Sequence, residues 1–382
     1  MSFECPHCHK KYIHDYNRDI HIKLVCNSNK KEPTKMKGIS LFSGCGGDTL
    51  GMEQANIDVV AYVEKEKVFQ DTHNANFPNS TLIGDDISKV PDSEFLKYTG
   101  KIDIIFAGFP CQGFSHAGKK NANDPRNTLF REFARAVKII KPKYFIGENV
   151  KGLLSRKTDD GENYIDIIKK EFTDMGYSLD YKVLKANEYN VPQKRERLII
   201  IGTNTGKELK FPEPNNNVND LKNIINFNMK GALKIDSSHY DMSEEVPKEC
   251  ILTNNRNKEH ANDPHPFLKL RALDKTFVYN NKPYPCLISF GKRSSGNNIE
   301  VIDIRNPSKT IICTYNHQPR LFVPLKNKNG YFLRCLLPDE LKQIQGFPSD
   351  YIICGNDSKK IIQIGNAVPP PLIKAVVETL IS

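Results

Sequence analysis

The chain has 382 residues, with 55 lysines and arginines against 45 aspartates and glutamates, and so carries a formal net charge of +10. At roughly 100 to 200 residues per domain, this length predicts two or three domains with a sizeable core. Hydrophobic residues make up 38% of the chain and come in clusters as long as a strand or a helix, which excludes disorder throughout. The modest basic excess favours a polyanionic partner such as nucleic acid without establishing one.

The N-terminal segment lacks the apolar core of a signal peptide, and no run approaches the roughly 20 apolar residues that span a bilayer. We therefore expect an intracellular protein with no membrane association. In a reducing compartment the ten cysteines are expected to act as thiols, metal ligands or catalytic groups rather than as disulfides.

The first thirty residues contain four candidate zinc ligands, Cys5, Cys8, His21 and Cys26. Their C-x2-C-x12-H-x4-C spacing lets two thiolates from a tight turn and a His and a Cys from one helix face close a tetrahedral site. Residues 1–30 resemble a ββα zinc finger of the C2H2 type with Cys in place of the last His, and we expect one structural Zn²⁺. The alternative is a thiol-rich tail without metal, and Arg18 departs from the aliphatic residue usual in such fingers. The finger's partner, DNA or protein, stays open.

From residue 38 onward, strand-like apolar runs alternate with helical stretches. The runs cover residues 39–42, 59–63, 102–108, 144–150 and 198–204. Residues 129–140 place Phe133, Val137 and Ile140 at helical spacing and predict a helix. This alternation predicts an open, largely parallel α/β sheet with helices on both faces, whose ligands gather at the carboxyl ends of the strands.

The regular alternation ends after residue 204, and a Pro- and Asn-rich break follows at 211–220. We expect residues 206–330 to form a separate, smaller domain. The main α/β domain then comprises residues 37–205 and 331–382, and an apolar helix from about Leu372 closes the chain.

The first two strands of the main domain end in groups suited to a nucleotide-like ligand. Gly44, Gly46 and Gly47 form a turn that a ligand can approach closely before a helix begins. Glu64 ends the next strand, where a carboxylate can hydrogen-bond ribose hydroxyls. Thr49 stands where the dinucleotide fingerprint has its third glycine, which favours another adenosine-bearing ligand over NAD. A plain strand-to-helix turn is an equal alternative.

Later strand ends carry groups suited to covalent catalysis. Cys111 follows Pro110 in a glycine-bounded loop at the same sheet edge, which suits a nucleophile, although a lone cysteine is more commonly a buried structural thiol. Glu148 ends the next strand. Three further polar residues, Gln193, Arg195 and Arg197, occupy alternate positions and so lie on one side if extended.

Nine segments in this order resemble the DNA cytosine C5-methyltransferases. They are FSGCGG (42–47), Glu64, GDDI (84–87), GFPCQGFS (108–115), DPRNTLF (124–130), ENV (148–150), QKRER (193–197), LKQIQGFP (341–348) and QIGNAVPP (363–370). The resemblance covers residues 38–205 and about 330–382. It implies a Rossmann-like methyltransferase sheet, S-adenosyl-L-methionine (AdoMet) as cofactor, double-stranded DNA as partner and a target-recognition domain at 206–330.

The resemblance also implies a role for individual residues. Cys111 would add to C6 of a flipped cytosine, Glu148 would bond at N3, and Arg197, less directly Arg195, would hold the O2 edge. The implied AdoMet-binding residues are Phe42, Gly44, Gly46, Gly47, Glu64, Asp86, Ile87, Pro110 and Asn366. The adjacent Asp85 makes the adenine assignment ambiguous by one residue.

Two other functions compete with DNA cytosine methylation. One is C5-methylation of a tRNA cytosine by a similar catalytic domain, and the other is a catalytically silent regulator that binds nucleic acid. For the methyltransferase we expect catalysis by a monomer, in the cytoplasm or nucleus wherever the target DNA lies. A cognate restriction endonuclease is a candidate partner.

Overall fold

The computed structural model describes most of the chain in two compact units, Met1–Met36 and Lys37–Ser382. The described residues are 35–110, 129–158, 161–215, 217, 219–234, 251–253, 300–315 and 320–382, with short strands at 3–4, 11–12, 240–241, 269–271, 277–279, 282–284 and 287–290. In the first unit, β1 (Phe3–Glu4) pairs antiparallel with β2 (Lys11–Tyr12).

A seven-stranded sheet organises the second unit, in the order β5-β4-β3-β6-β7-β10-β8. Its strands are β3 (Lys37–Leu41), β4 (Asp58–Val63), β5 (Thr81–Gly84), β6 (Ile104–Ala107), β7 (Tyr144–Asn149), β8 (Ser178–Lys185) and β10 (Glu196–Thr203). Strands β5, β4, β3, β6 and β7 run parallel to one another. Strand β10 pairs antiparallel with both β7 and β8. The predicted open, largely parallel sheet is confirmed.

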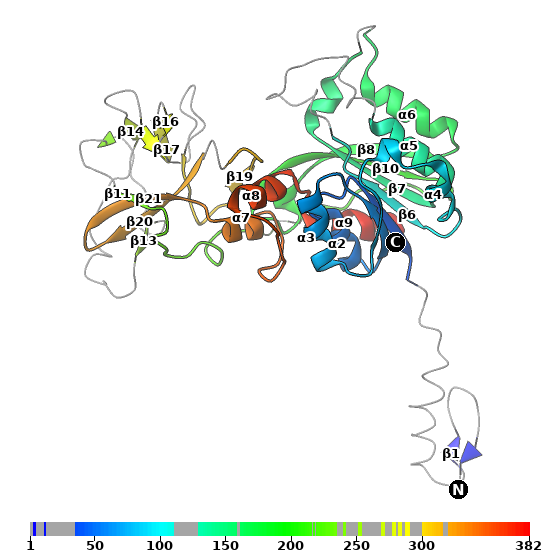
Figure 1. Cartoon of the computed structure of the whole chain (residues 1–382), viewed down its shortest axis with the longest axis horizontal. Coiled ribbons are helices and arrows are strands. Elements are labelled where there is room, and N and C mark those ends of the chain that lie inside the picture. The colour runs from blue at the N-terminus through cyan, green and yellow to red at the C-terminus, as the bar shows by residue number, and fades with distance from the viewer. Residues whose placement is uncertain are drawn as a thin grey trace. The chain divides into compact units, whose positions relative to one another are not determined.

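Helices cover both faces of this sheet (Figure 1). The helices of this unit are α2 (Gly47–Gln54), α3 (Lys67–Asn76), α4 (Asp92–Leu96), α5 (Leu129–Ile140), α6 (Tyr164–Asp174), α7 (Pro338–Ile344), α8 (Asp357–Asn366) and α9 (Pro370–Ile381), with short 3-10 turns η2 (Ile87–Lys89), η4 (Lys151–Ser155) and η5 (Ala186–Glu188). Helix α2 packs against α9, and α5 packs against α4 and α6. Among the described residues, no helix is both long enough and apolar enough to cross a membrane.

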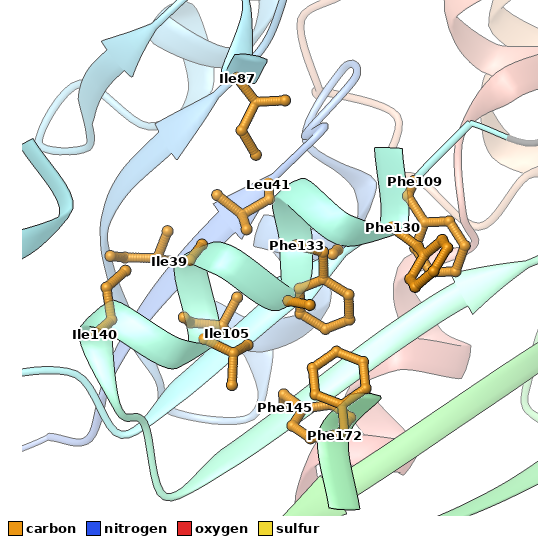
Figure 2. Packing of buried hydrophobic residues seen from close by; sticks show 14 of the residues in the cluster. Ile39, Leu41, Ile87, Ile105, Phe109, Phe130, Phe133, Ile140, Phe145 and Phe172 are labelled. Carbon is orange, nitrogen blue, oxygen red and sulfur yellow. The ribbon is translucent and has the colours of Figure 1, made fainter. Parts of the chain in front are cut away.

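The α5 face of the sheet holds a core rich in aromatic rings. Phe133 of α5 meets Phe145 of β7 edge-on, with ring centroids 5.6 Å apart, and Phe145 stacks on Phe172 of α6 at 4.2 Å (Figure 2). Ile39 and Leu41 of β3 are buried in the same cluster. Because side chains alternate along a strand, Ser40 between them faces α2 instead. The helix predicted at 129–140 is α5, and its apolar stripe is what fixes it on the sheet.

A second, eight-stranded sheet occupies much of the region between β10 and α7. Its strands are β11 (Leu233–Lys234), β12 (Tyr240–Asp241), β13 (Leu252–Thr253), β14 (Lys269–Arg271), β17 (Leu287–Phe290), β18 (Glu300–Val301), β20 (Leu321–Asn327) and β21 (Gly330–Cys335). Two small pairs accompany it, β15 (Phe277–Tyr279) with β16 (Lys282–Tyr284), and β9 (Gln193–Lys194) with β19 (Ser308–Lys309).

The second sheet extends past residue 330, the expected end of the smaller domain. Strand β21 runs to Cys335, past residue 330. Leu221, Phe322 and Leu333 share one buried cluster with Leu341 of α7 and Ile361 of α8. The region 206–330 and the C-terminal segment therefore share one core. The segments that form it are distant in the sequence, so their apolar faces meet only in the folded chain.

Candidate active site

The turn after β3 forms one side of the candidate active site. Gly44 and Gly46 have φ of 57° and 81°, in the left-handed region that glycine adopts without strain. Glu64, at the end of β4, is nearly buried and accepts a hydrogen bond from the Gly44 amide at 2.7 Å and from the Glu66 amide at 2.8 Å. Burial raises the pKa of the Glu64 carboxyl above its usual value. The carboxylate thus fixes the glycine turn beside it.

The C-terminal segment packs against this turn. Cys45 Sγ lies 3.7 Å from the Gln363 carbonyl, and the Tyr351 hydroxyl donates to the Cys45 carbonyl at 2.5 Å. A methyl group on Gly47 would lie 2.3 Å from the Val368 carbonyl oxygen. Asn366, at the end of α8, is exposed between buried neighbours. The glycine turn and the C-terminal motif, whose Cys45 and Gln363 are 318 residues apart in the sequence, therefore meet at one edge of the sheet.

The glycine turn fits an adenosine-bearing cofactor. A Cβ placed on Gly44 would meet no atom within 4 Å, so the backbone there borders open space at the carboxyl end of the central strands, where open α/β sheets bind ligands. Phe42, just before the turn, is a non-glycine residue with φ of 58°, a conformation that concentrates at ligand sites. These residues, with Glu64, would hold AdoMet.

Asp86 and Ile87 lie at the end of β5 with their side chains already engaged. The Asp86 carboxylate accepts from the amide and hydroxyl of Ser88 and from Lys65 Nζ at 3.3 Å. The hydrogen bond from Ser88 is the main reason that the pKa of Asp86 lies below its usual value. The Ile87 side chain is buried in the α5 core. The adjacent Asp85 is exposed, and it remains the alternative to Asp86 as the adenine contact.

The ends of β6 and β7 bring the catalytic candidates together. Arg197 Nε lies 2.7 Å from Glu148 Oε1, and both side chains are about 85% buried, with 14% and 15% exposed. A Cβ on Gly108 would lie 3.7 Å from Glu148 Oε2 and 3.8 Å from the Phe42 carbonyl oxygen. Three features therefore converge here: the backbone that leads to Cys111, the Glu148 carboxylate and the glycine turn. Cys111 itself lies outside the described residues.

Asn149 holds the backbone next to the predicted nucleophile. Its amide nitrogen donates to the Phe109 carbonyl at 3.1 Å, and its amide oxygen accepts from the Val150 amide at 2.8 Å. Phe109 is buried, and Pro110 after it is half-buried. The main chain is therefore anchored two residues before Cys111. Sequence reasoning placed Glu148 here and assigned Asn149 no role, although the ENV motif contains both.

Arg195 departs from the sequence-based expectation. Its guanidinium donates to the carbonyls of Ile311 and Gly365, both at 3.0 Å, and the side chain is 1% exposed. Only Arg197 of the two arginines reaches Glu148. The backbone here is not simply extended, because the Arg195 amide donates to the Gln193 carbonyl at 2.9 Å, and the two arginines reach different partners. A direct catalytic contact for Arg195 is not what the structure provides.

A buried polar network lies behind the glycine turn and was not anticipated. Ser40 of β3 donates to Asp48 of α2, and both are almost fully buried. Burial raises the pKa of Asp48 to about 7. His73 of α3 contacts Thr49 Oγ1 at 3.2 Å through Nε2, and burial lowers its pKa to about 3. In the sequence, Asp48 directly follows FSGCGG and resembles an ordinary acidic residue in the first turn of a helix. Its position alone therefore does not predict the network.

The predicted zinc ligands Cys5, Cys8, His21 and Cys26 all lie outside the described residues. Within the described part of the chain, no group of three His, Cys, Asp or Glu side chains could hold a metal ion. There, too, Cys45, Cys313, Cys335 and Cys354 form no disulfide.

Comparisons with known proteins agree with this geometry. Residues 36–382 match the C-5 cytosine-specific DNA methylase family. The chain is 32% identical to the Type II methyltransferase M1.HphI of Haemophilus parahaemolyticus, covering 90% of this chain and 86% of the relative. It is 34% identical to M.PspPI of Psychrobacter over 93% and 82% of the two chains, and 33% identical to M.Eco47II of Escherichia coli over 90% and 78%.

Solved structures share the fold. A Spodoptera frugiperda DNMT2 variant superposes with a TM-score of 0.62 at 16% identity, covering 91% of this chain and 100% of the other. A DNA modification methyltransferase encoded within an E. coli prophage gives 0.59 at 22% identity, over 91% and 98%. With the sequence matches and the converging site, these findings show that the chain belongs to the C-5 cytosine-specific DNA methylase family and is an AdoMet-dependent DNA cytosine-5 methyltransferase.

Proposed function

We propose that this enzyme methylates cytosine through a covalent adduct between Cys111 and C6 of the base. The observation that carries the proposal is the Arg197–Glu148 pair, 2.7 Å apart and mostly buried, beside the backbone that leads to Cys111. Cytosine C5 is a weak nucleophile, and addition of a thiolate to C6 makes it an enamine-like carbon that can attack an electrophilic methyl group.

The chain's residues divide this reaction between them. The Cys111 thiolate forms the S–C6 bond, and Glu148 in its protonated form donates to N3, so that the electrons displaced from the ring are neutralised. Arg197 holds the O2 edge and stabilises the same developing charge. Bound AdoMet would supply the methyl group that C5 takes up, with S-adenosylhomocysteine as the second product. Loss of the C5 proton to solvent and return of the N3 proton to Glu148 then break the S–C6 bond and free Cys111.

We assign AdoMet to the edge formed by the glycine turn and the C-terminal motif. Phe42, Gly44, Gly46 and Gly47 would contact its methionine part and Glu64 its ribose. Asp86, Ile87, Pro110 and Asn366 complete the proposed set. The fixed Glu64 carboxylate and the open space at Gly44 support this assignment. The target base would have to leave the duplex to reach Cys111, as methyltransferases in general require.

The experiment that tests the covalent step uses DNA in which target cytosines carry fluorine at C5. Fluorine cannot leave as a proton does, so the adduct should persist and migrate as a protein–DNA complex in a denaturing gel. Cys111→Ala should give neither adduct nor methyl transfer. Transfer of label from AdoMet to DNA by Cys111→Ala would contradict the proposal. Parallel incubation with tRNA tests the RNA alternative.

We propose residues 206–330 as the target-recognition region, because the second sheet lies largely within them and none of the nine methyltransferase segments does. The relatives are Type II methyltransferases, so we propose that this enzyme is the modification partner of a cognate restriction endonuclease and acts as a monomer on double-stranded DNA. Base-resolution mapping of methylated DNA would identify the sequence read. A methylation pattern without any fixed sequence would contradict the pairing with an endonuclease.

We also propose that residues 1–30 form a zinc finger held by Cys5, Cys8, His21 and Cys26. The antiparallel pairing of Phe3 with Tyr12 provides the hairpin that a ββα finger requires. Elemental analysis of the full chain should find about one zinc per molecule, and Cys8→Ala should lose it. Absence of zinc from protein purified without chelators would contradict the finger.

A further inference from the structure

Gln193 and Arg195 both bond to the backbone of one residue, Ile311. The Ile311 amide donates to Gln193 Oε1 at 2.9 Å, and the Ile311 carbonyl accepts from Arg195 Nη1 at 3.0 Å. Strands β9 and β19 pair in parallel just before this contact, and Thr310 Oγ1 adds a bond to the Lys194 carbonyl at 2.9 Å. The segment 308–311, by which the chain returns from the second sheet, is thereby fixed to the catalytic sheet.

The same two side chains are also linked to backbone carbonyls on either side of Asn366, those of Gly365 and Ala367. Arg195 Nη2 donates to the Gly365 carbonyl at 3.0 Å. On the other side, Gln193 donates to Gln345 Oε1 at 2.6 Å, and Gln345 in turn donates to the Ala367 carbonyl. Asn366 is the exposed residue between Gly365 and Ala367. Its position is therefore set by Arg195 directly and by Gln193 through Gln345.

The placement of Arg195 is costly, which argues that it does more than fill space. A fully buried guanidinium loses its hydration, and carbonyl oxygens offset that loss only in part. Its Nε has no hydrogen-bond partner, and within the described part of the chain no carboxylate forms an ion pair with it. An apolar side chain would pack here without that cost. Only a planar group with several donors can hold the carbonyls of Ile311 and Gly365 at once.

We propose that Gln193 and Arg195 are positioning residues that join the return segment 308–311 to the Asn366 turn, and that they act on AdoMet binding through Asn366. This inference rests on the proposed assignment of AdoMet to the edge that includes Asn366. It gives Gln193 and Arg195 of QKRER a task distinct from that of Arg197, which is proposed to hold the base.

The test measures the dissociation constant of AdoMet for the full chain by calorimetry, without DNA. Arg195→Met should weaken AdoMet binding by about tenfold, and Arg195→Lys, which can reach one carbonyl, should weaken it less. Gln345→Met breaks the second link without touching Arg195 and should also weaken binding. Arg197→Met should leave AdoMet binding within about twofold of the wild type, because it faces the base.

Matched controls separate positioning from a general loss of stability. Arg334 is another fully buried arginine, which donates to the carbonyls of Asn226 and Asn228 and pairs with Glu340. Arg334→Lys should lower the melting temperature as Arg195→Lys does, yet leave AdoMet affinity unchanged. Gln343→Met, in α7 just before Gln345 and with its side chain bonded to the Asp339 carbonyl of the same helix, is the control for Gln345→Met.

The outcomes distinguish this inference from the assignment of the cofactor site. Wild-type AdoMet affinity in Asn366→Ala would overturn the assignment and the inference together. Loss of affinity in Asn366→Ala with wild-type affinity in folded Arg195→Lys, Arg195→Met and Gln345→Met would overturn the inference alone. If Arg195→Met does not fold, Arg195→Lys and Gln345→Met decide the matter.

Discussion

Arg197 Nε of β10 lies 2.7 Å from Glu148 Oε1 of β7. The two strands are antiparallel neighbours, and the pair lies where β7 ends. Burial lowers the pKa of the Arg197 guanidinium, and the facing Glu148 carboxylate opposes that shift. The pair presents a donor and an acceptor side by side in a place where water is largely excluded. Such pre-oriented groups stabilise charge that develops on a bound base.

Arg197→Met should therefore lower the rate of methyl transfer by about 10²- to 10³-fold, while the melting temperature changes much less. Single-turnover transfer of label from AdoMet to DNA measures the effect. Because the two groups act together, Arg197→Met combined with Glu148→Gln should cost less than the sum of the single losses. Lys151→Met, which removes an exposed contact to Glu196, should have no effect. Equal losses of methyl transfer in Arg197→Met and in the control Lys151→Met would count against the assignment.

Asn149 offers a test of how the nucleophile is positioned. Asn149→Ala removes the donor that holds the Phe109 carbonyl and leaves a buried acceptor unpaired, which costs about 1–3 kcal/mol of folding free energy. A shift of the loop by about 1 Å is enough to lower kcat by about 10²-fold. Denaturant unfolding and single-turnover kinetics measure the two effects. Asn163→Ala, at an exposed helix start, is the control. An Asn149→Ala enzyme with full activity would show that the anchor is dispensable.

Two glycines of the cofactor turn should respond differently to alanine. At Gly44 the added methyl group enters open space, so Gly44→Ala should raise the AdoMet dissociation constant more than it lowers stability; the positive φ costs about 1 kcal/mol. At Gly47 the methyl group would lie 2.3 Å from the Val368 carbonyl oxygen, so Gly47→Ala should mainly lower the melting temperature. Calorimetric titration and thermal unfolding of both variants test the contrast. Identical behaviour of the two would contradict it.

Asp48 should make stability depend on pH. Its pKa is about 7 in the folded protein and near 3.8 when exposed, so between about pH 4 and 7 the folded state binds a proton that the unfolded state does not. This contribution to stability therefore falls as pH rises through that range and is gone above pH 7. Asp48→Asn removes the dependence, and its stability relative to wild type should rise by on the order of 2 kcal/mol from pH 5 to pH 7.

Denaturant unfolding of both proteins at several pH values measures this difference. The comparison is needed because His73, with a pKa lowered to about 3, has the opposite effect. Its stabilising contribution is lost as pH falls below about 6.5, since the unfolded histidine then binds a proton and the folded one does not. His73 is common to wild type and variant, so it cancels. Parallel curves for the two proteins would show that Asp48 does not titrate in this range.

The local and ordered features of this protein were determined by the sequence alone. Apolar runs of strand length, the helical spacing of Phe133 and Ile140, and nine motifs in order predicted the parallel sheet, the helix α5 and the family. These signals are local because residue spacing decides which face of a strand or helix becomes apolar. The order of parallel strands then brings their carboxyl ends to one edge, so Glu64 and Glu148 could be placed there in advance.

Tertiary structure alone decided which partners each polar side chain found. Alternate spacing in QKRER placed Arg195 and Arg197 on one side of the chain, yet Arg195 bonds to carbonyls 116 and 170 residues away, whereas Arg197 meets Glu148. The shared core of Leu221 and Leu341 likewise crosses the domain boundary expected at residue 330. Burial and hydrogen bonding between distant segments depend on how the chain packs, and residue spacing carries no record of that packing. The division of labour within QKRER is therefore a property of the folded molecule.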